Sequence, residues 1–277
     1  TDSPNVALLP VNLASGTIAA DMYLSPTRAN TGLTLLAVSD GSAYLSVQLN
    51  RSSAYDRISV STRVGTTTTW LAIKDAAGLS NDRGYTLAAV MTTTNIFVYV
   101  DGTLQLQYTF QTGDLTGLGQ EIGLRTWVGS SDEDGQSRWD RFLVTTSVDT
   151  PAIRVPATPL RLTAASNSAG SADLSWQTPG NGGSALTSYT LTSSAGYSQT
   201  GIDPSLTSYT ATGLSGVAQT FTLTAINAAG SSVGTVSNSV TPGSTTVPGA
   251  PTNVAATGGN ASAFVTWNDT AINGGSS

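Results

Sequence analysis

The chain has 277 residues, only 10% of them charged, and a formal net charge of −6. It contains neither cysteine nor histidine, which excludes disulfides, thiolate metal sites, thiol nucleophiles and an imidazole base. There is no cluster of Lys and Arg for nucleic acid or an anionic membrane surface, and no apolar run approaches the roughly 18 residues of a membrane span. We therefore expect neither a nucleic-acid partner nor membrane insertion, and any catalysis would have to use carboxylates or an oxygen-bound cation.

Apolar and polar residues alternate along most of the first 150 residues, and no helical stripe of ten or more residues interrupts them. In RISVSTRV, residues 57–64, isoleucine and valine occupy one face, and arginine and serine occupy the other. A period of two residues predicts half-buried strands. About ten such strands are expected at this spacing, and they lie in residues 18–24, 33–38, 43–49, 57–64, 69–73, 85–91, 95–100, 103–110, 121–127 and 141–146. This density predicts an all-β, jelly-roll sandwich of two sheets.

Two of these strands are expected to form a hairpin, NIFVYVDGTLQLQYTF, in residues 95–110. The turn is predicted at Asp101-Gly102, because glycine tolerates the positive φ of a tight turn. In the second strand, alternation puts Leu104 and Leu106 on the inner face and the glutamines on the outer face.

A loop follows that carries three consecutive acids, Asp132, Glu133 and Asp134, among glycines and serines. A retaining glycosidase needs two carboxyl groups about 5 Å apart that project into one cleft. Consecutive loop residues point in different directions, so we do not expect a catalytic pair here. Two interpretations remain, a solvated turn and a Ca²⁺ site built from hard oxygen ligands. No other cofactor is indicated.

Tryptophan and arginine flank this loop on both sides, in EIGLRTW (121–127) and RWDRFLV (138–144). Alternation predicts that they lie on the faces opposite the inward-pointing aliphatic and phenylalanine side chains. If the two strands pair as a hairpin, two indoles and two guanidinium groups share one surface: Arg125, Trp127, Trp139 and Arg141. Aromatic faces stack on sugar rings and arginine binds hydroxyls or carboxylates, so this surface is a candidate glycan-binding patch. The alternative is that the tryptophans pack against a neighbouring strand, domain or subunit.

The composition changes near residue 150. Residues 1–150 hold 14 acids and 9 bases, whereas residues 151–277 hold 3 acids and 2 bases. The stretch VDTPAIRVPATP lies at this change, and TPGSTTVPGAP follows at 241–251; prolines of this density are typical of stiff linkers. We therefore expect three units, in residues 1–150, 151–244 and 245–277.

An internal repeat relates the last two units. LSWQTPGNGGSA at 174–185 is echoed by VTWNDTAINGGSS at 265–277, so that Trp176 corresponds to Trp267 and the Asn-Gly-Gly-Ser motif recurs. The spacing of 91 to 92 residues indicates tandem domains rather than a solenoid. The second copy supplies only the first two strands of such a domain, which cannot bury a core by themselves.

Residues 157–243 resemble a fibronectin type III domain through TPLRLTAAS, ADLSWQTPGNGGSALTSYTL, LTSYTATGL and QTFTLTAINAAG. The resemblance implies an immunoglobulin-like sandwich, with Trp176 and Tyr189 in the core, that serves as a spacer or adhesive module without catalytic residues. One position departs from the family pattern, because Gln219 stands where a corner tyrosine is usual. Its amide can still bind the backbone but fills less of the core. VPGAPTNVAATGGNASAFVTWND begins a second, truncated domain of this kind, and Trp267 is expected to occupy a core position in it as Trp176 does.

Residues 1 to about 148 resemble a concanavalin-like or laminin-G-like sandwich, through LTLLAVSDGSAYLSVQL, FVYVDGTLQL and the closing EIGLRTWVGSSDEDGQSRWDRFLVTT. The order of such a domain followed by fibronectin type III domains is similar to that of minor tail proteins of bacteriophages infecting actinobacteria. This resemblance implies an adhesive virion component that contacts other tail proteins and host cell-surface polysaccharide, is not an enzyme, and forms a homo-oligomer such as a trimer. The alternative is a secreted bacterial carbohydrate-binding protein or an accessory domain of a glycoside hydrolase.

Overall fold

The structure is a computed structural model that describes part of the chain. The described residues are 5–9, 15–24, 30–37, 41–51, 56–75, 79, 83–119, 121–127, 138–167, 170–243 and 250–268. Every regular element in these ranges is a β-strand, which confirms the predicted all-β class. No helix in the described ranges is long and apolar enough to cross a membrane.

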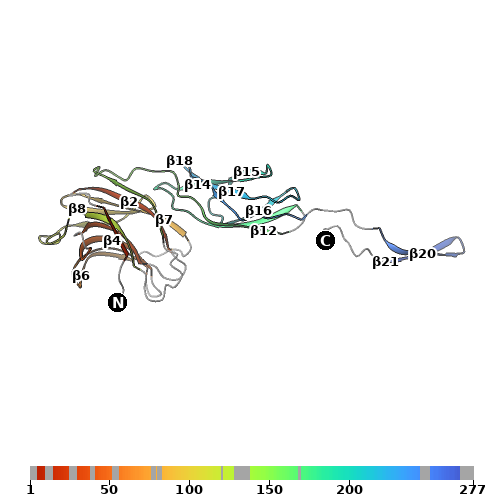
Figure 1. The fold of residues 1–277 in the computed structure, drawn as a ribbon, viewed down its shortest axis with the longest axis horizontal. Coiled ribbons are helices and arrows are strands. Elements are labelled where there is room, and N and C mark those ends of the chain that lie inside the picture. The colour runs from red at the N-terminus through yellow and green to blue at the C-terminus, as the bar shows by residue number, and fades with distance from the viewer. Residues whose placement is uncertain are drawn as a thin grey trace.

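The first eleven strands form two antiparallel sheets that lie face to face (Figure 1). The six-stranded sheet has the order β1 (Asn5–Leu9), β10 (Glu121–Trp127), β3 (Asn30–Ala37), β4 (Ala43–Arg51), β5 (Asp56–Val64) and β6 (Thr67–Asp75). The five-stranded sheet has the order β11 (Arg138–Thr145), β2 (Gly16–Leu24), β7 (Arg83–Met91), β8 (Asn95–Val100) and β9 (Thr103–Thr109).

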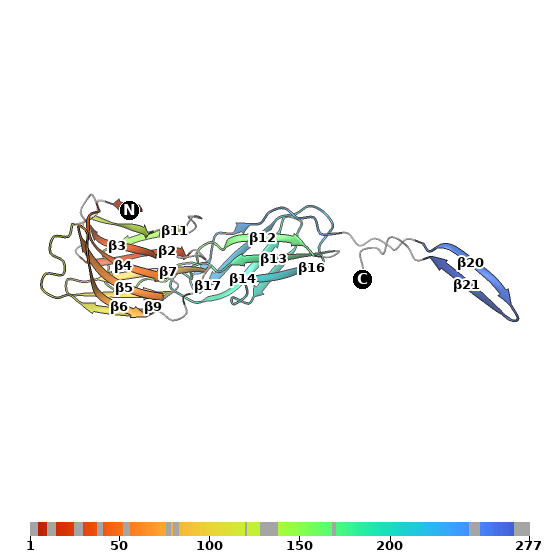
Figure 2. The same cartoon turned by 90° about the horizontal axis from the view of Figure 1, so that it is seen from below.

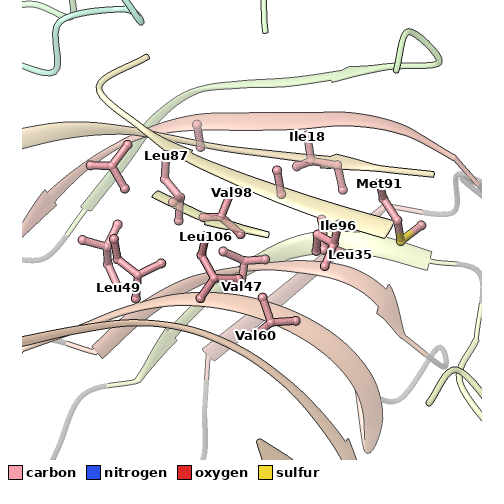
Figure 3. Close-up of a cluster of buried hydrophobic side chains, with 14 of the residues drawn as sticks. Ile18, Leu35, Val47, Leu49, Val60, Leu87, Met91, Ile96, Val98 and Leu106 are labelled. Atoms are coloured by element: carbon pink, nitrogen blue, oxygen red, sulfur yellow. The ribbon is translucent and has the colours of Figure 1, made fainter. Parts of the chain in front are cut away.

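The core of this first sandwich lies between the two sheets. Figure 3 shows Ile18, Leu87 and Val98 of the five-stranded sheet facing Val47 and Val60 of the six-stranded sheet. Each fully buried aliphatic side chain of this size stabilises the fold by about 1.5–3 kcal/mol relative to an exposed one. The alternation of apolar residues along the strands therefore sets which face of each sheet is buried.

The hairpin of β8 and β9 turns at Asp101-Gly102, as the sequence predicts. Both residues have positive φ, 52° and 80°, as a two-residue turn that matches the twist of the strands requires. The inward position predicted for Leu104 is wrong, because its side chain is 46% exposed. The register shifts between Val98 and Tyr99, so that the regular alternation along β9 does not extend to Leu104.

A second sandwich follows. Its smaller sheet has the order β12 (Leu160–Ser166), β13 (Ser171–Gln177) and β16 (Ser208–Thr212). The larger sheet has the order β15 (Ser198–Ile202), β14 (Leu186–Ser193), β17 (Phe221–Asn227) and β18 (Gly230–Ser231), and β19 (Thr235–Val236) also pairs with β17. Trp176 and Tyr189 are buried in its core, with their rings in edge contact at 5.3 Å, as predicted.

Gln219 is buried in this second sandwich, at the position where a corner tyrosine was expected. Its Nε2 atom donates a hydrogen bond to the carbonyl oxygen of Ser215 at 3.2 Å, and its backbone pairs with Val240. The predicted backbone hydrogen bond of the amide is therefore confirmed.

The last two described strands, β20 (Thr252–Gly259) and β21 (Ser262–Asn268), form a two-stranded ribbon. Trp267 is 56% exposed, in contrast to the buried Trp176 to which it corresponds in the repeat. The core position predicted for Trp267 is therefore not occupied here, because no further described strand belongs to this sheet and two strands cannot enclose a side chain.

Candidate functional site

The four residues predicted to form a glycan-binding patch do not lie on one hairpin. Strand β10 lies between β1 and β3 in the six-stranded sheet, whereas β11 pairs with β2 in the five-stranded sheet. The predicted pairing of residues 121–127 with 138–144 is therefore wrong. The reason is that alternation specifies the buried face of a strand but does not specify the strand beside it. These two strands belong to opposite sheets of the sandwich.

A β-bulge in β11 changes the position of Trp139. Asp140 pairs with Asp21 and Leu143 with Ala19, so β11 contains one residue more than β2 over this interval. The extra residue inverts the alternation, and Trp139 packs against the core together with Phe142. The predicted outward position of Trp139 is therefore wrong, and its packing matches the alternative interpretation.

Arg141, at the bulge, forms an ion pair instead of belonging to an open patch. Its backbone has a positive φ of 50°, and its Nε atom donates a hydrogen bond to Oδ2 of Asp21 at 2.6 Å. The side chain of Asp21 is only 3% exposed, so the guanidinium of Arg141 serves to neutralise a buried carboxylate.

The remaining predicted residues either belong to β10 or lie outside the described residues. Arg125 and Trp127 belong to β10 by their backbones, where they pair with Gly32 and Asn30 of β3, and their side chains lie outside what the structure describes. The three acids, Asp132, Glu133 and Asp134, lie outside the described residues altogether. No group of three or more carboxylates that could hold a metal ion occurs among the described residues, so the Ca²⁺ interpretation stays a prediction.

A different candidate site lies on the outer face of strands β4, β5 and β6, which are adjacent in the six-stranded sheet (Figure 2). The inner face is set by side chains in the core, such as Leu45 and Val47 of β4 and Ile58 and Val60 of β5. The intervening residues therefore lie on the outer face. The register aligns them in three rows across the strands: Asn50, Arg57 and Asp75; Gln48, Ser59 and Ile73; Ser46, Ser61 and Trp70.

Trp70 reaches this outer face because of a second irregularity. Val60 pairs with Ala72 and Ser61 with Trp70, so Leu71 is an extra residue in β6. Leu71 and Ala72 both pack against the core, which leaves Trp70 and Ile73 on the outer side. The side chain of Trp70 is 49% exposed, an unusual state for a residue type that is highly buried on average.

Small polar residues form the floor of this face, and their hydrogen bonds use the donors of two amides. Ser46 and Ser61 are fully buried and lie 3.3 Å apart through their Oγ atoms, and Nε2 of Gln48 donates to Ser46 at 2.9 Å. Similarly, Nδ2 of Asn50 donates to Oγ of Ser59, which lies in the neighbouring row, at 3.1 Å. The serines thus hold both amides in fixed orientations.

Asn50 has an acceptor that no described residue uses. The residue is 7% exposed, and its Oδ1 atom is buried without a hydrogen-bond partner in the part of the chain that the structure describes. An unsatisfied buried acceptor costs roughly 1–3 kcal/mol. Asn50 lines a cavity of about 220 Å³ together with Arg57, Ser59, Trp70 and Ile73. A donor that enters this cavity can therefore satisfy the carbonyl group of the amide.

The electrostatics of the cavity suit recognition rather than acid–base catalysis. Arg57 forms an exposed ion pair with Asp75, with 3.2 Å between Nε and Oδ1. Among the described residues that line the cavity there is no carboxylate. The walls instead offer an indole face, an aliphatic side chain, the guanidinium of Arg57 and the free acceptor of Asn50.

The sequence patterns did not predict this site, although one feature of the sequence pointed to it. Alternation in residues 57–64 correctly placed arginine and serine on the face opposite the core. A lone tryptophan in the threonine-rich strand TTTWLAIKD was the further signal. Nothing in the sequence, however, marks Leu71 as the extra residue of β6 or aligns Asn50 with Arg57.

Comparison with known proteins gives structural likenesses only. No protein-family model matches the chain, and no curated protein matches it. Among solved structures, a carbohydrate-binding module from Bacillus subtilis, CBM66, is 12% identical over 52% of this chain and 83% of its own, with a TM-score of 0.43. Sheep galectin-11 in complex with glycerol is 7% identical over 52% of this chain and 98% of its own, with a TM-score of 0.36. The galectin LEC-6 of Caenorhabditis elegans is 13% identical over 52% of this chain and 93% of its own, with a TM-score of 0.37. All three likenesses concern the fold alone.

Proposed function

We propose that the chain binds carbohydrate without transforming it, and that the binding site is the cavity beside Trp70 on the outer face of β4, β5 and β6. One observation carries the proposal: a half-exposed indole lines the same cavity as Oδ1 of Asn50, a buried acceptor with no partner among the described residues. A sugar ring has apolar C–H faces that pack on an aromatic ring and hydroxyl groups that donate hydrogen bonds at its edge. The cavity offers a partner for each of these two features.

The size of the cavity limits what it holds. Its volume of about 220 Å³ is below the roughly 300–1,000 Å³ of pockets that enclose drug-sized ligands. The proposed ligand is therefore a single sugar ring of a longer glycan, with the rest of the glycan outside the cavity. Arg57 supplies donors to ring oxygens or hydroxyls, and Asp75 balances its charge, so a neutral sugar suits the site.

The test uses the whole chain and two matched tryptophan variants. Binding to soluble dextran, galactan and mannan is measured by affinity electrophoresis and titration calorimetry. Trp70→Ala is expected to weaken binding to the glycan recognised by at least tenfold, about 1.4 kcal/mol. Trp267→Ala is the control, because Trp267 is similarly exposed but lies on β21, and it is expected to bind as the unaltered chain does. Absence of binding to all neutral glycans, or equal binding by Trp70→Ala, would contradict the proposal.

The wider setting that we propose for this binding is adhesion of a phage tail to the host cell surface, with other tail proteins as partners. The order of the units, which resembles that of minor tail proteins, supports it; secretion by a bacterium is the alternative. Antibody raised against residues 1–150 is expected to label the tails of intact particles in electron micrographs. Unlabelled particles, together with secretion of the protein into a bacterial culture medium, would favour the alternative.

A further inference from the structure

The first and second sandwiches approach each other so closely that glycine is required at the contact. Gly84 of β7 donates its backbone N–H to the carbonyl oxygen of Thr178 at 2.8 Å. A Cβ atom on Gly84 would clash with the backbone nitrogen of Gly180 and lie 2.8 Å from the carbonyl carbon of Pro179. The three nearest atoms to this position belong to the second sandwich, so the absence of a side chain at Gly84 serves the contact between the two sandwiches.

The loop that makes this contact continues into the Asn-Gly-Gly motif of the internal repeat, Asn181-Gly182-Gly183. Its Gly182 donates a backbone hydrogen bond to Oγ1 of Thr86 at 2.9 Å. A Cβ atom on Gly102, in the turn between β8 and β9, would clash with the carbonyl oxygen of Gly183. The loop therefore contacts the first sandwich at two places, the beginning of β7 and this turn.

A buried carboxylate lies beneath the loop and joins it to both the first sandwich and the linker. Asp21 accepts hydrogen bonds from Oγ1 of Thr86 and from Nε of Arg141, each at 2.6 Å. Arg154 of the linker places its Nη2 atom 3.6 Å from Oδ1 of Asp21, and its backbone N–H donates to the carbonyl oxygen of Gly182 at 2.8 Å. Gly180 covers the same carboxylate, since a Cβ atom there would lie 3.1 Å from Oδ1.

The second sandwich also holds the linker and the loop together. Nδ2 of Asn227, in β17, donates to the carbonyl oxygens of Arg154 and Asn181, each at 2.7 Å. Arg161 of β12 lies over the ring of Tyr23, with 5.8 Å between its guanidinium carbon and the ring centroid. The contacts thus come from the linker, the loop and the body of the second sandwich, and they converge on β2 and β7 of the first.

We propose that Asp21, Gly84, Thr86 and Gly102 form a docking surface specific for the Asn-Gly-Gly loop, and that this surface, not the proline-rich linker, fixes the two sandwiches as one rigid body. Prolines stiffen a linker but leave rotation about the neighbouring bonds. Directional hydrogen bonds to a buried carboxylate, combined with backbone packing that excludes a Cβ, define a single orientation. The docked sandwich lies beyond one end of the first, and the strands β4 to β6 remain uncovered (Figure 2).

The sharpest test is Gly84→Ala. Gly84 is not at a positive φ, and alanine in a strand loses less conformational entropy on folding than glycine does, so the first sandwich tolerates the change. The three atoms nearest to the added methyl group all belong to the second sandwich. Gly258→Ala in β20 is the matched control, because a Cβ atom there meets nothing within 4 Å.

The readout is the distance distribution between two spin labels. The chain has no cysteine, so Thr93→Cys and Thr200→Cys introduce unique labelling positions at exposed sites, one on each sandwich. The otherwise unaltered chain and Gly258→Ala are expected to give one narrow distribution, and Gly84→Ala a distribution at least twice as wide. A wide distribution in the unaltered chain, or a narrow, unshifted one in Gly84→Ala, would overturn the proposal.

A second variant covers the case in which Gly84→Ala does not fold, as judged by circular dichroism. Gly180→Val lies in the loop of the second sandwich and directs its side chain toward Asp21 and the carbonyl oxygen of Tyr85. It is expected to widen the distribution in the same way, and an unchanged distribution would overturn the proposal. Binding at the Trp70 cavity is expected to persist in both variants. The proposal of the docking surface and the proposal of the glycan site can therefore be contradicted separately.

Discussion

The buried Oδ1 atom of Asn50 and the half-exposed indole of Trp70 line one cavity, although β5 separates the strands that carry them. Neither residue is explained by the fold alone. A buried acceptor without a partner and an exposed tryptophan are both unfavourable in the free protein, and each would be relieved by a ligand that donates a hydrogen bond and presents an apolar face. Their coincidence distinguishes this cavity from an ordinary depression in a polar sheet face.

Asn50→Leu is expected to separate binding from stability. Leucine has a similar volume and removes the unsatisfied acceptor together with one hydrogen bond to Ser59, so the free energy of unfolding should change by less than about 1 kcal/mol. Glycan binding should fall at least tenfold, because the ligand hydroxyl loses its acceptor. Urea denaturation and titration calorimetry on the same preparation measure the two effects. A large loss of stability with retained affinity would show that Asn50 is structural.

Trp127→Ala and Trp139→Ala are expected to behave differently, although the sequence treats the two residues alike. Trp139 packs against the core, so its truncation should lower the free energy of unfolding by about 2–4 kcal/mol and leave binding unchanged. Trp127 belongs to β10, in the same sheet as the cavity, and alternation predicts an outward side chain. Its truncation should leave stability within about 1 kcal/mol and weaken binding to long glycans more than to short ones. Equal affinity for both lengths would remove Trp127 from the site.

The difference between these two tryptophans shows what the sequence can predict. Alternation correctly predicts that Ile58 and Val60 face the core, and the Asp-Gly pair correctly predicts the turn at residues 101 and 102. Val64, predicted on the same face as Ile58 and Val60, is instead 55% exposed. Both signals are local. The bulges at Leu71 and Arg141 each add one residue and invert the alternation beyond them, and no residue type marks either position. Strand pairing is also non-local, which is why the hairpin of β10 and β11 was wrong and why the cavity was missed.

Asp101→Asn is expected to change how stability depends on pH. Burial raises the pKa of Asp101 above its ordinary value of 3.8, against the opposing effects of Arg83 and of the hydrogen bond from the backbone of Thr86. A raised pKa in the folded state means that folding favours the protonated acid. This contribution to stability is present at low pH and is lost as the pH rises from 3.8 through the pKa of the folded state.

Asparagine at position 101 removes that titration and retains the turn, because Asn-Gly is the preferred pair for a two-residue hairpin with positive φ. The free energy of unfolding at pH 7 minus that at pH 4 should therefore be more positive for the variant than for the unaltered chain. Denaturant titrations at the two pH values measure this difference. A more negative value would show that the ion pair with Arg83 outweighs the desolvation of the carboxylate.

Removal of the last ribbon is expected to reduce self-association without unfolding the two sandwiches. Strands β20 and β21 expose Val254, Phe264 and Trp267 on a two-stranded ribbon, and exposed apolar patches of this kind promote association. A chain of residues 1–243 retains the hydrogen bond from Gly170 to the carbonyl oxygen of Gly243 and all strands of both sandwiches. Its thermal midpoint should therefore match that of the full chain, while light scattering should show less concentration-dependent association.

Phe264→Ser in the full chain should reduce association in the same direction, because it removes an apolar side chain from the ribbon and leaves both sandwiches unaltered. Unchanged association in both would place the self-contact on the sandwiches, where the predicted homo-oligomer would then have to form.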